Sequence, residues 1–153
     1  MTITAQNLVS ISPIGPAQQK AFTSLEANKN LFLTGSAGTG KTFILLYWAL
    51  KEVLDKASAY EKVIIVRSLL PSRDIGFLPG TLEEKSNLYQ DPYRILVRYL
   101  FEMPSEQAFT DLYDKLHAQG SLEFYSTSFL RGQTFDRSII IVDESENLLF
   151  QEL

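Results

Sequence analysis

One stretch of the chain has the residue types and the spacing of a phosphate-binding loop. Residues 35–42 read Gly-Ser-Ala-Gly-Thr-Gly-Lys-Thr and match the pattern G-x-x-x-x-G-K-[ST] at every defined position. Glycines let successive backbone N–H groups turn inward around an anion, and the lysine adds a positive charge. We therefore expect the phosphates of a nucleoside triphosphate to be bound by Gly35, Ser36, Ala37, Gly38, Thr39, Gly40, Lys41 and Thr42.

The neighbours of this loop predict how it is positioned. A short apolar run, residues 31–34, precedes it, and a long helical pattern begins at Phe43. The context is therefore strand, tight loop and helix. The first turn of such a helix offers unpaired N–H donors and the positive end of its dipole. The Thr42 hydroxyl falls where a phosphate-bound Mg²⁺ needs an oxygen ligand.

Two acidic residues follow the strongest strand pattern in the chain. Residues 138–142 read Ser-Ile-Ile-Ile-Val and lead directly into Asp143 and Glu144. Functional groups gather at the carboxyl ends of parallel strands, where the phosphate loop also lies. We expect Asp143 to hold Mg²⁺ through its water shell and Glu144 to be catalytic by polarising an attacking water. Lys41 is the second catalytic candidate, through its positive charge at the phosphates. The alternative is an acidic helix N-terminus, which Asp and Glu favour in any case.

A glutamine could select the base of the nucleotide. Gln18 and Gln19 lie in a helical pattern just before the apolar run. A glutamine amide can donate to and accept from an adenine edge at once. Of the two we favour Gln18 for nucleotide binding. The alternative is that both belong to a solvated helix face.

Three arginines are candidates for contact with phosphate, of a nucleotide or of a nucleic acid strand. Arg67 follows the second predicted strand, Arg73 lies in the next loop, and Arg131 precedes the last strand. The alternative for each is an ion pair with one of the 18 acidic residues, and for Arg73 it is the favoured one. His117 is the only histidine, and we assign it no chemistry.

Composition narrows the class of protein. A chain of 153 residues fits one domain that can bury a real core. There are no cysteines, which excludes disulfides and thiolate zinc sites. The net charge of -4 offers no general attraction to nucleic acid. The N-terminus lacks signal-peptide features and no apolar run approaches the roughly 20 residues of a membrane span. We expect a cytoplasmic protein with no membrane partner.

The pattern of apolar residues predicts an α/β fold in which strands alternate with helices. An N-terminal arm and loop, residues 1–16, precedes a core of residues 17–153, with a helical insertion at about 81–120. Long crossovers between β-branched runs indicate a three-layer α/β/α sandwich with a parallel sheet. Strands are predicted at 31–34, 63–66, 122–125 and 138–142, and helices at 17–26, from 43 to about 56, from Thr81, from Pro92, and from 105 to 119.

Several blocks together resemble the PhoH-like phosphate-starvation-inducible ATPases, which are related to superfamily 1 helicases and are often carried by phages. The blocks are residues 35–42, Gly-Phe-Leu-Pro-Gly at 76–80 with Leu82, Glu84 and Lys85 after it, residues 128–134, and residues 139–147. The resemblance implies a P-loop NTPase of RecA-like fold that binds ATP and Mg²⁺ and hydrolyses ATP. It further implies RNA or single-stranded DNA as a partner and a ring-forming homo-oligomer.

The chain departs from the family pattern in three ways. Glu146 replaces a neutral glutamine, Gln133 replaces an arginine, and the sequence stops at Leu153. Relatives continue with a strand that lies between the phosphate-loop strand and the strand ending at Asp143. The fold is then incomplete at its C-terminus, and an empty slot exposes two strand edges. The chain is a fragment, which we favour, or a partner donates the strand, or the neighbouring strands pair directly.

Three functions compete at this point. The first is an ATPase coupled to RNA or DNA remodelling. The second is a nucleotide-binding module that hydrolyses little without a partner or a further segment, because an arginine finger is worth about 10³ to 10⁵ in rate and the sequence identifies none. The third is a small-molecule kinase. Such kinases carry a catalytic lid of basic residues late in the chain, and we find no such basic segment in the sequence.

Overall fold

The computed structural model describes residues 3–67, 82–127, 130, 132–145 and 148, with the backbone alone for 82–89. Several residues named above lie outside this described part: the block at 76–80, Arg73, Thr81, Arg131 and Glu146. No helix in the part of the chain that the structure describes is both long and apolar enough to cross a lipid bilayer.

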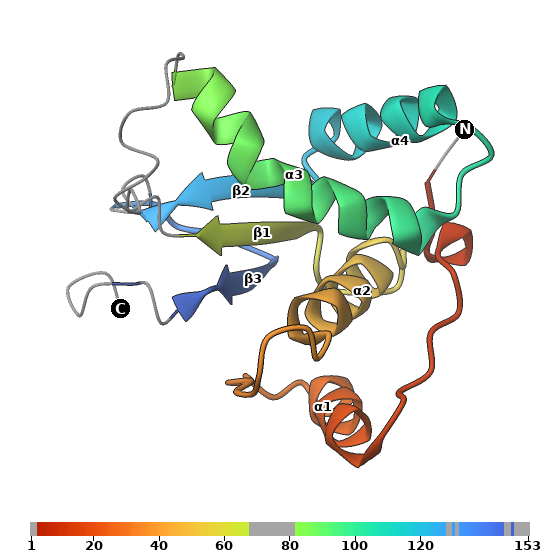
Figure 1. The fold of residues 1–153 in the computed structure, drawn as a ribbon, viewed down its shortest axis with the longest axis vertical. Helices are drawn as coiled ribbons and strands as arrows, with labels where there is room; N and C mark the ends of the chain where they lie inside the picture. Colours follow the sequence, from red (N-terminus) through yellow and green to blue (C-terminus); the bar gives the residue numbers. More distant parts are fainter. Residues whose placement is uncertain (1–2, 68–81, 128–129, 131, 146–147, 149–153) are drawn as a thin grey trace.

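A parallel sheet forms the centre of the molecule (Figure 1). Its strands are β1 (Lys62–Arg67), β2 (Leu122–Ser126) and β3 (Ser138–Asp143), in the spatial order β2-β1-β3. All three were predicted to within two residues, β1 and β3 from β-branched runs and β2 as the candidate at 122–125. Because the strands are parallel, their carboxyl ends lie at one edge, and Arg67 of β1 is opposite Asp143 of β3.

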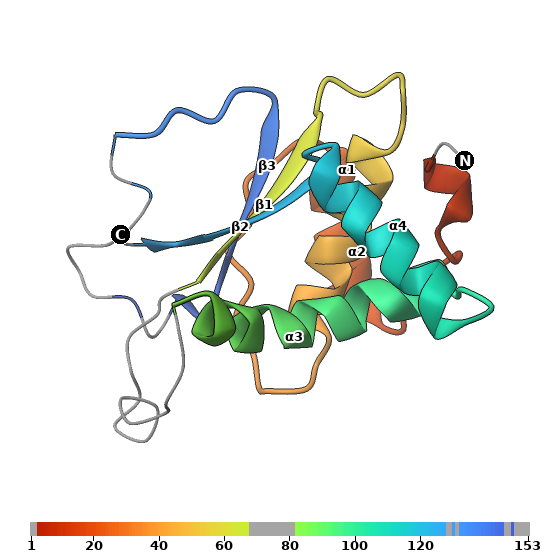
Figure 2. The same cartoon turned by 90° about the horizontal axis from the view of Figure 1, so that it is seen from above.

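Helices cover the sheet and follow the predicted order. They are α1 (Pro16–Glu26), α2 (Lys41–Val53), α3 (Leu82–Phe101) and α4 (Glu106–Ala118). Ser105 caps α4 by accepting a hydrogen bond from the Ala108 N–H. Figure 2 shows α2, α3 and α4 together on one side of the sheet. The α/β fold with a parallel sheet is therefore confirmed.

The core lies between this sheet face and the helices. Fully buried residues from the helices and from the strands form this core: Leu46, Leu50 and Leu116 from helices, and Val63, Ile65 and Leu122 from strands. Within β3, Ile141 faces this core and is 4% exposed, whereas Ile140 and Val142 are 49% and 46% exposed. This alternation follows from the two-residue period of a strand.

The N-terminal arm is attached by backbone hydrogen bonds. It contains a single 3-10 turn, η1 (Ala5–Asn7). The Val9 N–H donates to the Leu100 carbonyl at 2.8 Å, and the Ile11 N–H donates to the Tyr47 hydroxyl at 3.4 Å. The arm thus runs across α2 and α3 before α1 begins.

The prediction of separate helices starting at Thr81 and at Pro92 is wrong. One helix, α3, runs without a break from Leu82 to Phe101, with Pro92 in its interior. Proline removes one helical hydrogen bond and crowds the preceding turn, a cost of about 3 kcal/mol. Burial of Tyr93, Val97 and Leu100 directly after it outweighs that cost. Figure 1 shows α3 bending along its length, as expected of a proline-containing helix.

The predicted strand at 31–34 is also wrong. These residues form no strand, and the only strand that pairs with β3 among the described residues is β1. A groove of about 780 Å³ lies between residues 31–33 and β3. Leu31, Phe32 and Leu33 line one wall, and Ile139 to Val142 line the other. A strand needs a neighbour for its hydrogen bonds. Residues 31–34 and β3 therefore do not pair with each other. Direct pairing, the last of the three alternatives for the empty slot, is wrong.

Candidate functional site

The phosphate-loop candidate has a backbone conformation that depends on glycine. Gly35, Gly38 and Gly40 have φ angles of 148°, 75° and 81°. These values lie in the region that side chains disfavour. Gly40 immediately precedes α2, and its carbonyl accepts the first helical hydrogen bond, from the Ile44 N–H at 3.0 Å. The loop therefore ends at the N-terminus of a 13-residue helix, where unpaired N–H groups favour an anion.

Lys41 lies against the loop that it follows. Its Nζ atom donates to the carbonyls of Gly35 and Ser36, each at 2.8 Å. The Thr39 hydroxyl also donates to the Ser36 carbonyl, at 2.9 Å. The positive charge of Lys41 is thus held at the loop, close to the backbone groups that would surround a phosphate.

Gln18 contacts the same loop from α1. Its Nε2 donates to the Thr39 carbonyl at 3.4 Å, and its Oε1 accepts from the Ile14 N–H at 2.8 Å. A Cβ on Gly40 would lie 3.6 Å from Nε2. Of the two candidate glutamines, Gln18 is therefore the one beside the loop.

Asp143 is brought to the start of α2. The Thr42 hydroxyl donates to Asp143 Oδ1 at 3.0 Å, although 101 residues separate them. The Glu144 N–H donates to the same oxygen at 3.1 Å. The arrangement arises because β3 ends at Asp143 beside the amino end of α2. The two residues assigned to Mg²⁺ from the sequence thus touch each other.

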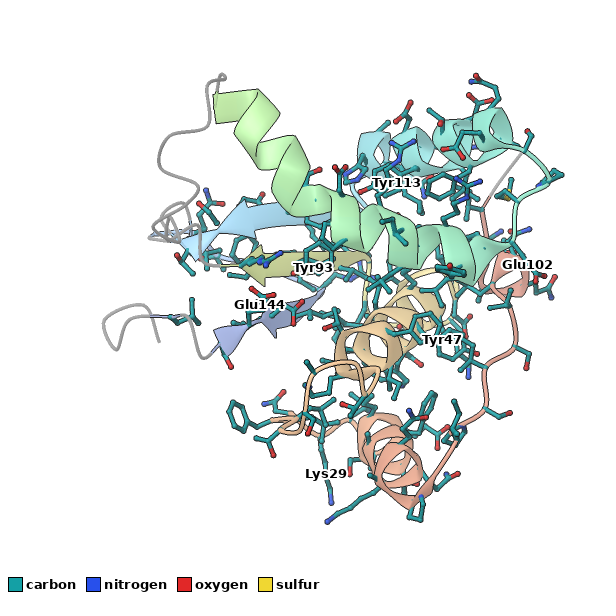
Figure 3. All side chains as sticks on the ribbon, in the orientation of Figure 1. Lys29, Tyr47, Tyr93, Glu102, Tyr113 and Glu144 are labelled. Carbon is teal, nitrogen blue, oxygen red and sulfur yellow. The ribbon has the colours of Figure 1, made fainter. Side chains whose placement is uncertain are left out.

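Tyr93 of α3 also contacts Asp143, and no residue pattern in the sequence predicts this contact. Its hydroxyl donates to Asp143 Oδ2 at 2.8 Å. Burial, and then the neighbouring Asp143 charge, raise the pKa of Tyr93, so the hydroxyl remains a donor. In Figure 3 the labelled side chains Tyr93 and Glu144 lie near each other, with Tyr93 reaching from α3 toward the sheet.

Glu144 pairs with the arginine that ends the neighbouring strand. Arg67 Nη2 lies 2.5 Å from Glu144 Oε2, and both side chains are partly exposed. Burial lowers the pKa of Arg67. The hydrogen bond to Glu144 and the electrostatic influence of Tyr93, Glu144 and Asp143 outweigh this effect, so the pKa of Arg67 lies above its ordinary value. Glu144 also has a φ of 51°, unusual for a residue other than glycine. Of the arginine alternatives, the ion pair is the one seen for Arg67.

The oxygen donors at this edge suit Mg²⁺. A threonine hydroxyl and a carboxylate, 3.0 Å apart, are hard ligands of the kind that Mg²⁺ prefers. The described residues include no group of three or more His, Cys, Asp or Glu able to hold a metal ion. Mg²⁺ commonly takes one or two protein ligands together with substrate phosphates and water. The donor set therefore fits a metal that arrives with a nucleotide.

One groove joins these residues. The groove beside β3 is lined at one end by the loop residues from Ala37 to Thr42 and by Asp143 and Glu144. Lys41 and Glu144 thus open onto the same space. His117 lies elsewhere, on α4 between the rings of Tyr113 and Phe124.

Comparisons with known proteins identify the family of the chain. The family model described as PhoH-like protein matches residues 10–153. A PhoH-like protein of Mycobacterium leprae is 31% identical over 89% of this chain and 37% of its own length. Protein PhoH of Escherichia coli K12 is 33% identical over 86% of the chain and 36% of its own length. Protein PhoH2 of Bacillus subtilis is 32% identical over 79% of the chain and 27% of its own length.

The matched region spans only about a third of these relatives. It includes the loop at 35–42, the end of β3 and almost every described element between and around them. A family match over this much of the chain is decisive for membership. The chain belongs to the PhoH-like protein family.

Proposed function

We propose that this chain binds ATP with Mg²⁺ at the carboxyl edge of its sheet and hydrolyses it. The observation that carries the proposal is the 3.0 Å contact between Thr42 and Asp143. It places a helix N-terminus, a loop lysine and a carboxylate at one end of one groove. Family membership supports a nucleotide-binding P-loop domain.

Each residue has a distinct role in this proposal. The amides of the loop and Lys41 hold the phosphates, and Gln18 approaches the base from α1. Thr42 and Asp143 hold Mg²⁺, which when bound neutralises charge on the phosphates. Glu144 orients and deprotonates the attacking water. Its carboxylate is fixed by Arg67 at 2.5 Å.

The experiment compares Glu144→Gln with the wild-type chain. Loss of a general base lowers turnover by about 10² to 10⁴, so phosphate release should fall by that factor while ATP binding persists. Glu61→Gln is the matched control, because Glu61 pairs with Arg137 at the opposite end of the same strands. Unchanged phosphate release in Glu144→Gln would remove Glu144 from catalysis.

A nucleotide-binding module with little hydrolysis is the second candidate. The observation in its favour is the ion pair between Arg67 and Glu144, since Arg67 engages the carboxylate that would receive the water proton. This candidate predicts nucleotide binding with negligible turnover by the purified chain. Rapid multiple turnover would eliminate it.

The resemblance to helicase-related ATPases extends the first candidate to a nucleic acid partner and a ring. The proposed partner is RNA or single-stranded DNA, and the proposed assembly is a homo-oligomer. The test is phosphate release with and without each polymer, together with light scattering of the eluted chain. A monomer with unstimulated release would contradict both extensions.

A further inference from the structure

Tyr93 links α3 to the edge of the sheet that carries the candidate metal ligands. Its side chain is almost completely buried, at 2% exposed, and its ring packs against Phe124 of β2 with 5.5 Å between ring centroids. Its hydroxyl donates to Asp143 Oδ2 at 2.8 Å. The tyrosine is therefore held by packing at its ring and by a carboxylate at its hydroxyl.

Both oxygens of the Asp143 carboxylate are engaged, by different parts of the fold. Oδ1 accepts from the Thr42 hydroxyl and from the Glu144 N–H. Oδ2 accepts from Tyr93. The terminal torsion of an aspartate is broad, so the carboxylate plane is set by what its oxygens contact. Tyr93 thus supplies the donor to the carboxylate oxygen that Thr42 does not contact.

We propose that Tyr93 is a positioning residue for Mg²⁺: its hydroxyl occupies Asp143 Oδ2 and thereby directs Oδ1, beside the Thr42 hydroxyl, toward the metal and its water shell. This inference rests on the proposed nucleotide site. Hydrogen-bond partners of metal-binding side chains commonly change metal affinity by about 10- to 100-fold. Tyr93 therefore affects how tightly Mg²⁺ is held without touching it.

The hydroxyl, rather than the ring, carries this role. Phenylalanine at position 93 would keep the packing against Phe124 and remove only the donor. Tyr113 offers a matched comparison, because it is also a buried helix tyrosine, at 5% exposed. Its hydroxyl has no hydrogen-bond partner among the described residues. Removing it deletes a buried hydroxyl that makes no hydrogen bond to Thr42 or Asp143.

The experiment measures the Mg²⁺ dependence of nucleotide binding. A fluorescent, non-hydrolysable ATP analogue is titrated with wild-type, Tyr93→Phe and Tyr113→Phe chains, first in EDTA and then at increasing Mg²⁺. We expect equal binding in EDTA for all three. The Mg²⁺ concentration at half of the affinity gain should rise about 10-fold in Tyr93→Phe and stay at the wild-type value in Tyr113→Phe.

Other outcomes would overturn the inference in distinguishable ways. A wild-type Mg²⁺ midpoint in Tyr93→Phe, even with a lower urea midpoint, would mean that the hydroxyl serves only the fold. A wild-type chain whose nucleotide binding does not respond to Mg²⁺ would overturn the proposed function and this inference with it. Nucleotide binding that responds to Mg²⁺ in all three chains alike would overturn this inference alone.

A measurement on the wild-type chain keeps the inference testable if Tyr93→Phe does not fold. The Tyr93 hydroxyl proton is followed by NMR before and after addition of Mg²⁺ and the ATP analogue. The inference predicts that the hydrogen bond to Asp143 persists in the complex. Loss of that proton signal from its hydrogen-bonded position on binding would contradict the positioning role.

Discussion

The guanidinium of Arg67 lies 2.5 Å from a carboxylate oxygen of Glu144, although 77 residues separate them in the chain. The parallel register of β1 and β3 places Arg67 opposite Asp143. Glu144, the ion-pair partner of Arg67, is the next residue after Asp143. The left-handed backbone of Glu144, with φ of 51°, turns the chain at the end of β3. The proposed general base is thus held by a cation on the neighbouring strand.

Removing the charge of Arg67 should slow hydrolysis without weakening nucleotide binding. In Arg67→Met the side chain keeps an unbranched apolar stem but loses the guanidinium that pairs with Glu144. A base that is no longer held in place costs roughly 10-fold or more in turnover, so we expect kcat for phosphate release to fall about 10-fold. The ATP dissociation constant should remain within about twofold, since Arg67 is not assigned to the phosphates.

The control for this variant lies at the other end of the same strands. Arg137→Met removes an arginine that pairs with Glu61 and donates to the Ala59 carbonyl. We expect wild-type turnover there. An increase in turnover in Arg67→Met would show instead that the ion pair restrains Glu144, as the binding-module alternative requires.

Local sequence patterns were sufficient for the elements that position the site. The β-branched runs predicted β1 and β3, the apolar and aromatic residues at 122–125 made β2 a candidate, and the glycine spacing predicted the loop before α2. The contact between Thr42 and Asp143 also followed, because parallel strands and a phosphate loop share one edge. These features depend on residue type and spacing, which the sequence displays directly.

Tertiary packing decided the features that the sequence did not predict. Residues 31–34 have an apolar strand pattern, but no strand within the described ranges pairs with them. Pro92 was interpreted as a helix start, yet burial of Tyr93 carries α3 through it. The contact of Tyr93 with Asp143 joins residues 50 apart, and no periodicity encodes it. Such contacts emerge only when the helices are placed on the sheet.

The single histidine should make stability sensitive to acid. Burial lowers the pKa of His117 below its ordinary value of 6.5, although Asp114, a hydrogen bond with the Leu122 backbone and Glu123 act in the opposite direction. At a pH well above 6.5 the histidine is neutral in both the folded and the unfolded chain. As the pH falls below 6.5, the unfolded chain binds the proton more readily, so the free energy of unfolding decreases.

Replacing His117 with phenylalanine should reduce this sensitivity. The imidazole lies against the rings of Tyr113 and Phe124, and its Nε2 has no partner among the described residues. Urea unfolding from about pH 7 to about pH 5 should show a smaller loss of stability in His117→Phe than in the wild-type chain. Equal losses in the two proteins would mean that other groups cause the acid sensitivity.

The helix that carries Lys41 depends on its buried face. Leu46 of α2 is fully buried, at 0% exposed. A buried leucine truncated to alanine costs about 2 to 5 kcal/mol, so Leu46→Ala should lower the free energy of unfolding by that amount in urea. Ile14→Ala serves as the control, because Ile14 is 92% exposed and should change stability by less than about 0.5 kcal/mol. Equal effects of the two substitutions would contradict the described core.

The central claim is that the loop at 35–42 and the acidic pair Asp143 and Glu144 bind the same metal-nucleotide. Mn²⁺ in place of Mg²⁺ tests this directly, because its unpaired electrons broaden NMR signals of nearby nuclei. The isotope-labelled chain is titrated with Mn²⁺ and a non-hydrolysable ATP analogue, with Gly120 as the reference. Gly120 lies just before β2, at the opposite edge of the sheet.

The account predicts that the amide signals of Gly40, Thr42, Asp143 and Glu144 broaden together when both nucleotide and Mn²⁺ are present, while the Gly120 signal stays sharp. Without nucleotide the same Mn²⁺ concentration should leave all of them sharp, since the described residues hold no metal cluster of their own. Broadening at the loop with sharp signals at Asp143 and Glu144 would contradict the shared site.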